Sequence, residues 1–180
     1  MLQADKYSAI ETLRDGCRLE IRALTPDDRS NLIAAVARTS AESLRRRFFV
    51  PKNNFTDRET DFFLNVDFIN HVALVAVIEE GDRTAIVGGG RYIVVQPGEA
   101  KIAFAIVDHY QGRGIGRALM RHLVAIARAA GVKRLIAEVL AENLPMLRIF
   151  EQSGLAISTK REAELRHITL ELSSREASFK

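Results

Sequence analysis

The chain has 180 residues, 47% of them hydrophobic and 27% charged, which is ordinary for a globular domain with a single core. The formal net charge is +3 and no single basic run dominates, so we expect no nucleic-acid partner. No apolar run approaches the roughly 18 residues of a membrane span, and no secretory leader is recognised. We therefore expect a cytoplasmic protein without a membrane partner.

The N-terminal third is expected to contain one strand and three short helices. Thr25 and Pro26 are typical of a helix start, and Thr56 begins another helix with the spacing of a capping box. The expected elements are a strand over 18–23 and helices that start near residues 26, 41 and 56. We interpret Arg45, Arg46 and Arg47 in the second helix as a solvated face, with a contact to coenzyme or to an acidic substrate as the alternative.

The middle of the chain is expected to form an antiparallel meander of three strands. A buried run over 71–78 is followed by a second run over 85–95 and a third that ends at Ile106. Three consecutive glycines, 88–90, interrupt the second run. They indicate a bulge, a close backbone approach or simply a weak strand.

The third strand leads into a glycine-rich turn and then a helix. The turn reads QGRGIG over residues 111–116, and the helix repeats its apolar residues at three- and four-residue spacing up to Gly131. Free N–H groups and the macrodipole make such a helix start suitable for binding phosphate. No Gly-Lys-Ser/Thr follows, which excludes a P-loop, and the spacing fits a dinucleotide fingerprint poorly.

The C-terminal part is expected to add three strands and one helix. A strand over 134–140 is followed by Asn143, a plausible N-cap, and by a helix over 146–152 that stops at Gly154. Two last strands, over 155–158 and 164–172, complete the sheet. We expect one domain spanning 1–180, with 1–12 as a flexible lead-in and 173–180 as a flexible tail.

These motifs together resemble the GNAT superfamily of N-acetyltransferases over residues 13 to about 172. The QGRGIG turn resembles the acetyl-CoA signature of that family, and EVLAEN over 138–143 resembles the segment before its last helix. The segment SAESLRRRFF over 40–49 is similar to the acetyltransferase domain of bacterial protein-lysine acetyltransferases that modify acyl-CoA synthetases. The resemblance implies an α/β (α+β) fold with a mixed sheet of about six to seven strands and helices on both faces.

The resemblance also implies where acetyl-CoA binds. The pyrophosphate would lie on the amides of the turn, and the pantetheine along the end of the central strand and against Asn143. The implied cofactor-binding residues are Ile106, Val107, Gln111, Gly112, Arg113, Gly114, Ile115, Gly116, Arg117 and Asn143.

At the position of the catalytic base, which removes the proton of the acceptor amine, this chain departs from the pattern of the lysine-acetylating group. The lysine-acetylating group places a glutamate on the central strand where this chain has Lys101, so Glu138 and then Glu99 are the candidate catalytic carboxylates. Glu138 matches the base of the branch that acetylates ribosomal proteins. That branch has a tyrosine acid where this chain has Phe150, which leaves water or Tyr110 to protonate the thiolate.

We therefore expect an enzyme that acetylates a primary amine, such as a protein lysine or a small molecule, by direct attack in a ternary complex. The alternative is an acetyl-CoA-binding sensor or partner module with weak or no catalysis, because Lys101 replaces the usual base. No spacing of His, Cys, Asp and Glu indicates a metal site. The last strands leave a sheet edge that allows a homodimer.

Overall fold

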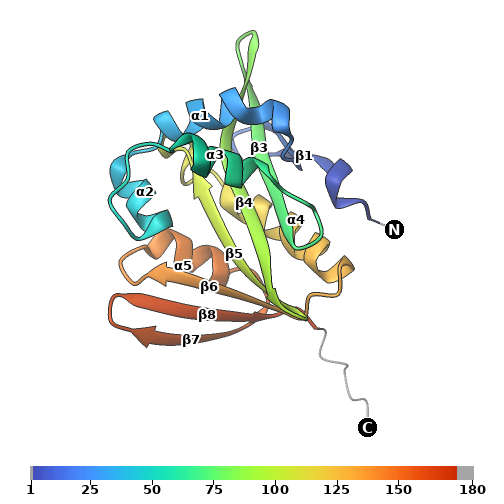
Figure 1. The fold of residues 1–180 in the computed structure, drawn as a ribbon, viewed down its shortest axis with the longest axis vertical. Helices are drawn as coiled ribbons and strands as arrows, with labels where there is room; N and C mark the ends of the chain where they lie inside the picture. The colour runs from blue at the N-terminus through green and yellow to red at the C-terminus, as the bar shows by residue number, and fades with distance from the viewer. Residues whose placement is uncertain (1, 174–180) are drawn as a thin grey trace.

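Two long apolar strands, β3 (His71–Glu80) and β4 (Arg83–Gln96), lie at the centre of the sheet in the computed structural model, which describes residues 2–173. The first eight residues of β3 are all buried, as expected where helices cover both faces of a sheet. The sheet has eight strands in the order β1-β2-β3-β4-β5-β6-β8-β7 (Figure 1). The other strands are β1 (Ser8–Thr12), β2 (Arg18–Ala23), β5 (Glu99–Ile106), β6 (Arg134–Leu140), β7 (Ala156–Glu162) and β8 (Leu165–Glu171).

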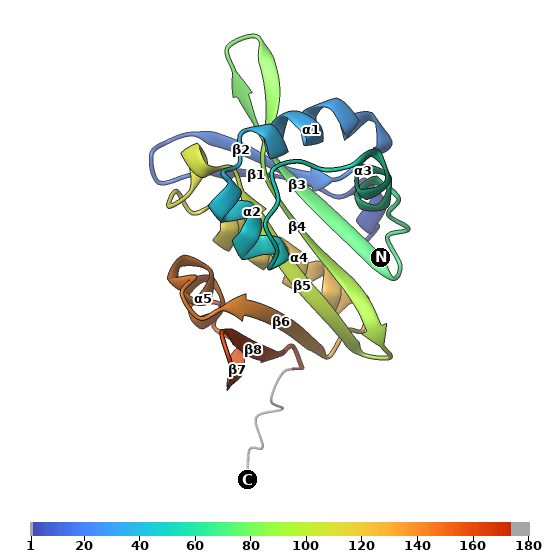
Figure 2. The same ribbon diagram turned by 60° about the vertical axis from the view of Figure 1, so that its left-hand side comes forward.

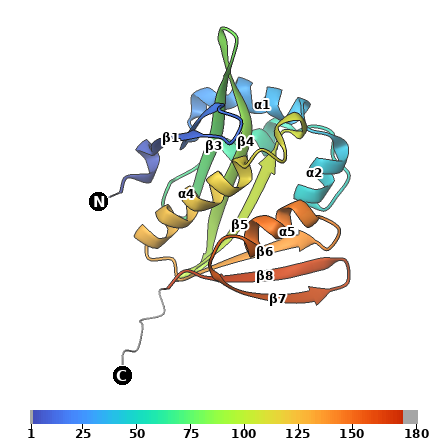
Figure 3. The ribbon, with the colours of Figure 1, turned by 180° about the vertical axis from the view of Figure 1, so that it is seen from behind.

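The helices divide between the two faces of this sheet. Figure 1 shows α1 (Arg29–Ala37), α2 (Ala41–Phe48) and α3 (Asp57–Leu64) in front of the strands, whereas Figure 3 shows α4 (Ile115–Ala129) and α5 (Leu144–Glu151) on the opposite side. Leu119 and Leu123 of α4 are completely buried, which confirms its expected apolar stripe. Among residues 2–173, no helix is long and apolar enough to cross a bilayer.

The prediction of a lead-in over 1–12 is wrong. Ser8–Thr12 pairs antiparallel with β2 and is the strand that raises the count above the expected six to seven. The hydroxyl of Tyr7 lies 2.5 Å from Nδ1 of His122 in α4, and a carboxylate oxygen of Glu11 lies 2.7 Å from its Nε2, so side chains also hold this segment. Of the expected tail over 173–180, residues 174–180 lie outside the described part of the chain.

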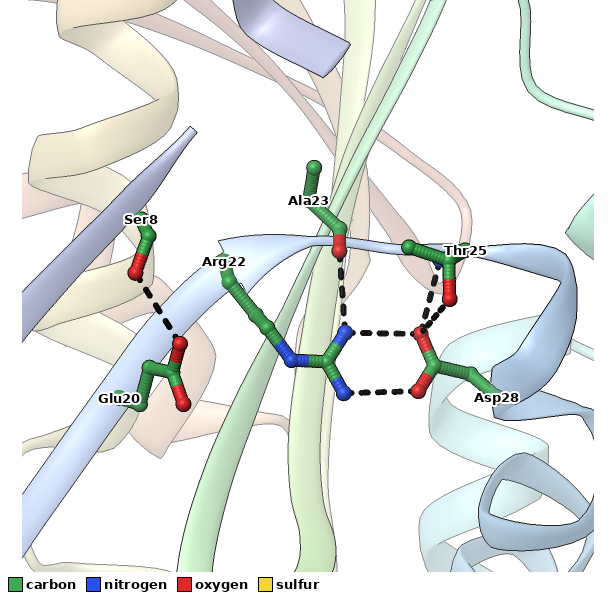
Figure 4. A network of polar contacts seen from close by, with 6 residues as sticks. All are labelled: Ser8, Glu20, Arg22, Ala23, Thr25 and Asp28. Carbon is green, nitrogen blue, oxygen red and sulfur yellow. Dashed lines mark hydrogen bonds and ion pairs between the residues drawn. The ribbon is translucent and has the colours of Figure 1, made fainter. Parts of the chain in front are cut away.

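The connection from β2 to α1 is fixed by a charged pair. Both Nη atoms of Arg22 donate to the Asp28 carboxylate at 2.8 and 2.7 Å, and the backbone N–H of Thr25 donates to the same carboxylate at 2.8 Å (Figure 4). Burial raises the pKa of Asp28, but these hydrogen bonds outweigh it and leave the pKa below its usual value. The carboxylate therefore stays ionised and closes a capping box at the helix start that the sequence predicted at Thr25 and Pro26.

The triple glycine in β4 marks both a bulge and a close approach. The register with β3 shifts between Ala76 and Val77, opposite this segment. A Cβ added to Gly90 would lie 2.7 Å from the Phe104 ring and 2.8 Å from Leu123, so α4 packs closely on the sheet only because these side chains are missing.

Candidate active site

Strands β5 and β6 separate shortly after they begin. Their parallel pairing covers only Glu99 with Arg134, Ala100 with Leu135, and Lys101 with Ile136. Beyond Lys101 the two strands diverge, with α2 and α5 beside the opening (Figure 2). Beyond that point the backbone N–H and C=O groups on the facing edges of β5 and β6 do not bond to each other, so they are available to a ligand.

A cavity of about 860 Å³ occupies this region. It is lined by β5 and β6, by the turn that precedes α4, by α2 and by the start of α5. Of the ten expected cofactor residues, all but Val107 line it: Ile106, Gln111, Gly112, Arg113, Gly114, Ile115, Gly116, Arg117 and Asn143. Val107 is buried and lines a second, smaller cavity instead.

The turn before α4 is built for the close approach of an anion. Gly112 and Gly114 have φ angles of 75° and 90°, and a Cβ added to either would meet nothing within 4 Å. Gly114 is the N-cap, and no side chain caps this 15-residue helix. The N–H groups of its first residues thus face the open cavity with the positive end of the macrodipole. Gly116 has another role, because a Cβ there would lie 2.6 Å from Cδ1 of Ile149 in α5.

Polar side chains fix the turn against α2. Nε2 of Gln111 donates to the Ile106 carbonyl at 3.0 Å and to Oγ of Ser43 at 3.1 Å. Asp108 accepts from the backbone N–H of Ser40 and from Oγ of Ser43. The glutamine expected as a cofactor residue therefore also positions the turn.

The hairpin between β1 and β2 reaches the same turn, which the sequence did not indicate. Asp15 accepts hydrogen bonds from Nε and Nη2 of Arg113 at 2.9 and 2.6 Å, so Arg113 is already paired. Arg14 lines the cavity from this hairpin and joins Arg117 as a cation near the turn.

Asn143 has the expected capping role. Its side-chain oxygen accepts from the Met146 N–H at 3.4 Å, and the residue is buried at the cavity wall. The cap uses the oxygen, so the side-chain NH₂ can donate to a ligand.

Of the two candidate catalytic carboxylates, Glu138 is the one that lines the cavity. It lies on β6 beyond the point of separation, and its Oε2 is 3.2 Å from Nζ of Lys101 on β5. Lys101 and Glu138 thus face each other from the two separating strands. Nδ1 of His167 on β8, the register partner of Glu138, lies 4.0 Å from Oε1. The sequence gives no signal for His167 at the site, because the β6–β8 register cannot be read from a local pattern.

Glu99 and Tyr110 lie differently from what the sequence suggested. Glu99 sits at the closed end of the strands, where it pairs with Arg134 at 3.3 Å and accepts from Gln96. The Tyr110 hydroxyl donates to Glu80 at 2.8 Å, and burial, followed by this carboxylate, raises its pKa. Neither group is directed at the Lys101–Glu138 pair. Among the described residues, no three His, Cys, Asp and Glu side chains gather as a metal site would require.

A model of the acetyltransferase (GNAT) family matches residues 39–155. The chain is 32% identical over 146 residues to acetyltransferase Pat of Mycolicibacterium smegmatis, an alignment that covers 79% of this chain and 42% of Pat. It is 30% identical over 138 residues to acetyltransferase PA5475 of Pseudomonas aeruginosa, covering 76% of this chain and 74% of that protein. The crystal structure of the GNAT domain of S. lividans PAT has a TM-score of 0.82 at 31% identity, covering 91% of this chain and 96% of that one. The chain thus spans less than half the length of Pat.

Proposed function

The chain belongs to the GNAT family of acetyltransferases, and from this membership we propose that it transfers the acetyl group of acetyl-CoA to a primary amine in a ternary complex. The observation that carries the proposal is the cavity between the separated ends of β5 and β6, with Glu138 on its wall and uncapped helix amides at its far end. The resemblance of residues 40–49 to protein-lysine acetyltransferases makes a protein lysine one candidate acceptor.

In this proposal acetyl-CoA lies along the separated strands. Its pyrophosphate accepts hydrogen bonds from the backbone amides of 113–117, with Arg14 and Arg117 adding positive charge. The pantetheine arm pairs with the open edge of β5 near Ile106 and receives a hydrogen bond from Asn143. Val107 serves as an apolar wall behind that edge, because its own N–H already donates to Val87.

The chemistry needs a base more than a nucleophile. The amine nitrogen attacks the thioester carbonyl carbon, its proton passes to Glu138, and the carbon–sulfur bond breaks as the amide forms. The CoA thiolate leaves and takes a proton from water. In this proposal the tetrahedral oxyanion accepts a hydrogen bond from the β5 backbone beyond Lys101, where β5 no longer pairs with β6.

One observation favours a second candidate function, an acetyl-CoA sensor with weak catalysis. Glu138 must give up its ion pair with Lys101 when it accepts a proton, and the ammonium repels a protonated amine. Lys101 is also an amine at the cavity wall, so its own acetylation would remove the charge.

A turnover assay with acetyl-CoA and a panel of amines tests the proposal. We expect CoA release with at least one amine and its loss in Glu138→Gln, with unchanged acetyl-CoA affinity by calorimetry. Tight acetyl-CoA binding without turnover on any amine would favour the sensor. A Glu138→Gln variant as fast as the parent would remove Glu138 as the base.

We further propose that residues 1–180 act as one acetyltransferase domain and that a homodimer forms through β7. This strand forms one edge of the sheet, and all seven of its residues are exposed. Light scattering at micromolar concentration tests the dimer, and a monomeric mass would contradict it.

A further inference from the structure

Two arginines, Arg47 of α2 and Arg91 of β4, lie on the face of the sheet that α1, α2 and α3 cover, and within residues 2–173 neither has an acidic partner. In α2, Leu44, Arg47 and Phe48 have the spacing of one helix face, and Leu44 is buried. Arg47 therefore points toward the sheet, and its interpretation as part of a solvated face is wrong. Burial lowers the pKa of Arg47 to about 10.

Arg91 of β4 is held beside it by neutral groups. Its Nη1 donates to the Phe63 carbonyl at 3.1 Å and to Nε2 of His71 at 2.8 Å, and its guanidinium lies 4.6 Å from the centre of the Phe63 ring. Burial lowers the pKa of His71 to about 4, so this imidazole is neutral and accepts the bond. Burial and the charge of Arg47 lower the pKa of Arg91 to about 9.

The carboxylates of this region are already used by other groups. Glu59 accepts from Lys52 and from the N–H of Thr56, and Asp67 accepts from the backbone N–H groups of 69–71. Among residues 2–173, neither Arg47 nor Arg91 forms an ion pair. Two like charges on partly buried side chains are costly without a counter-ion, and an anion between them would offset that cost.

Space for such an anion is present. Arg47 and Arg91 line a second cavity of about 90 Å³, floored by small residues of β4 and β5 and walled by Phe48, Phe55 and Phe63. One water needs only about 10–15 Å³ of such space, so a small anionic group fits. This cavity shares Arg47, Phe48 and the alanines 103 and 105 with the main cavity.

The distance from the second cavity to the Lys101–Glu138 pair matches the length of a small acceptor molecule. Arg91 is the register partner of Ala103, which is two residues beyond Lys101 on the same strand face. Two residues of a strand span about 7 Å and the step from β5 to β4 adds about 5 Å sideways, so Lys101 and Arg91 are roughly 8–9 Å apart along the diagonal, a span that an amine and an acid joined by a chain of several carbons can cover.

We propose that Arg47 and Arg91 form an anion subsite that binds a carboxylate of the acetyl acceptor. The inference rests on the proposed acetyl transfer to an amine and narrows its acceptors to amines that carry a carboxylate within a short chain. The two guanidinium groups would make charge-assisted hydrogen bonds to it, which are stronger than neutral ones. The carboxylate would come from a free amino acid or from an acidic residue next to a lysine.

Matched acceptors test the subsite. The panel contains amino acids whose amine and carboxylate are separated by about two to six carbons, together with their carboxamides, and lysine peptides with aspartate or asparagine as neighbour. We expect kcat/KM to favour the acid over the amide by at least about tenfold, and Arg47→Gln and Arg91→Lys to reduce that ratio by a similar factor. Arg83→Gln, on the exposed β3–β4 hairpin, should keep the ratio.

Calorimetric titration of the protein–CoA complex with the same acids and amides separates this inference from the proposed function. Tighter binding of the acid that disappears in Arg47→Gln supports the subsite even without turnover. Equal binding of acid and amide, or a preference that survives in both arginine variants, overturns it. The identity of the preferred acid, free or peptide-borne, distinguishes the two sources.

Discussion

Replacement of Gly114 by valine tests the cofactor site most directly. Gly114 has a φ of 90°, and the space beyond its Cα is open, so valine meets no protein atom at its Cβ. Two separate effects are expected: backbone strain in the folded protein, and obstruction of the surface on which the pyrophosphate would lie.

The two effects have different sizes. A left-handed conformation costs a non-glycine residue about 1–2 kcal/mol, which lowers the Tm of a chain of this length by roughly 2–8 °C. Loss of one charge-assisted hydrogen bond to phosphate, at about 1.5–3 kcal/mol, weakens acetyl-CoA binding by about tenfold to 150-fold, and loss of a second weakens it further. Calorimetry and thermal unfolding measure the two quantities separately.

Gly131 supplies the matched control. It has a φ of 81°, also meets nothing within 4 Å, and follows the opposite end of α4. Gly131→Val should therefore lose a similar amount of stability and keep its affinity within about twofold. Unchanged acetyl-CoA affinity in Gly114→Val, or an equal loss in both variants, would refute the placement of the phosphates.

Three further predictions concern the base, the pH dependence of stability and the packing of β4. Lys101→Glu should raise turnover, since it removes the ammonium that holds Glu138; equal or slower rates by CoA release would contradict this. His71 has a pKa of about 4 when folded and about 6.5 when unfolded, so it takes up a proton more readily when unfolded, and stability should fall by up to about 3 kcal/mol as the pH drops from 6.5 to 4. The free energy of unfolding, measured with urea at several pH values, should depend less on pH in His71→Gln than in the parent. Gly90→Ala should cost about 1–3 kcal/mol because its Cβ would clash with Phe104, whereas Gly89→Ala, with its nearest atom at 3.4 Å, should cost far less by the same measurement.

Residues that follow a local pattern were predictable from the sequence. The alternation that ends at Ile106, the glycine turn and the stripe containing Leu119 and Leu123 placed the central strand, the turn and α4 correctly. The strand Ser8–Thr12 was missed because Ile10 is its only large apolar residue and is 52% exposed. Its position depends on pairing with β2, which no local pattern records.

Pairings between distant segments explain the remaining differences at the site. His167 reaches Glu138 through the β6–β8 register, and Arg113 is paired by Asp15 from a hairpin 98 residues earlier. Arg47 is different, because a local signal existed: its spacing from buried Leu44 places it on the inner face of α2. Because three adjacent arginines are usually exposed to solvent, the sequence pattern favours a solvated face for all three.

Because β5 and β6 separate early, few backbone hydrogen bonds join the two parts of the sheet on either side of them. Within residues 2–173, strand pairing joins the β1–β5 part of the sheet to the part made of β6, β8 and β7 through only three residue pairs. The second part can therefore open as one cooperative unit at less cost than global unfolding. A ligand that spans the separated strands stabilises the closed form by mass action, so amide hydrogen exchange in 134–172 should slow when acetyl-CoA binds. The cosubstrate would then act as a structural brace as well as an acetyl donor.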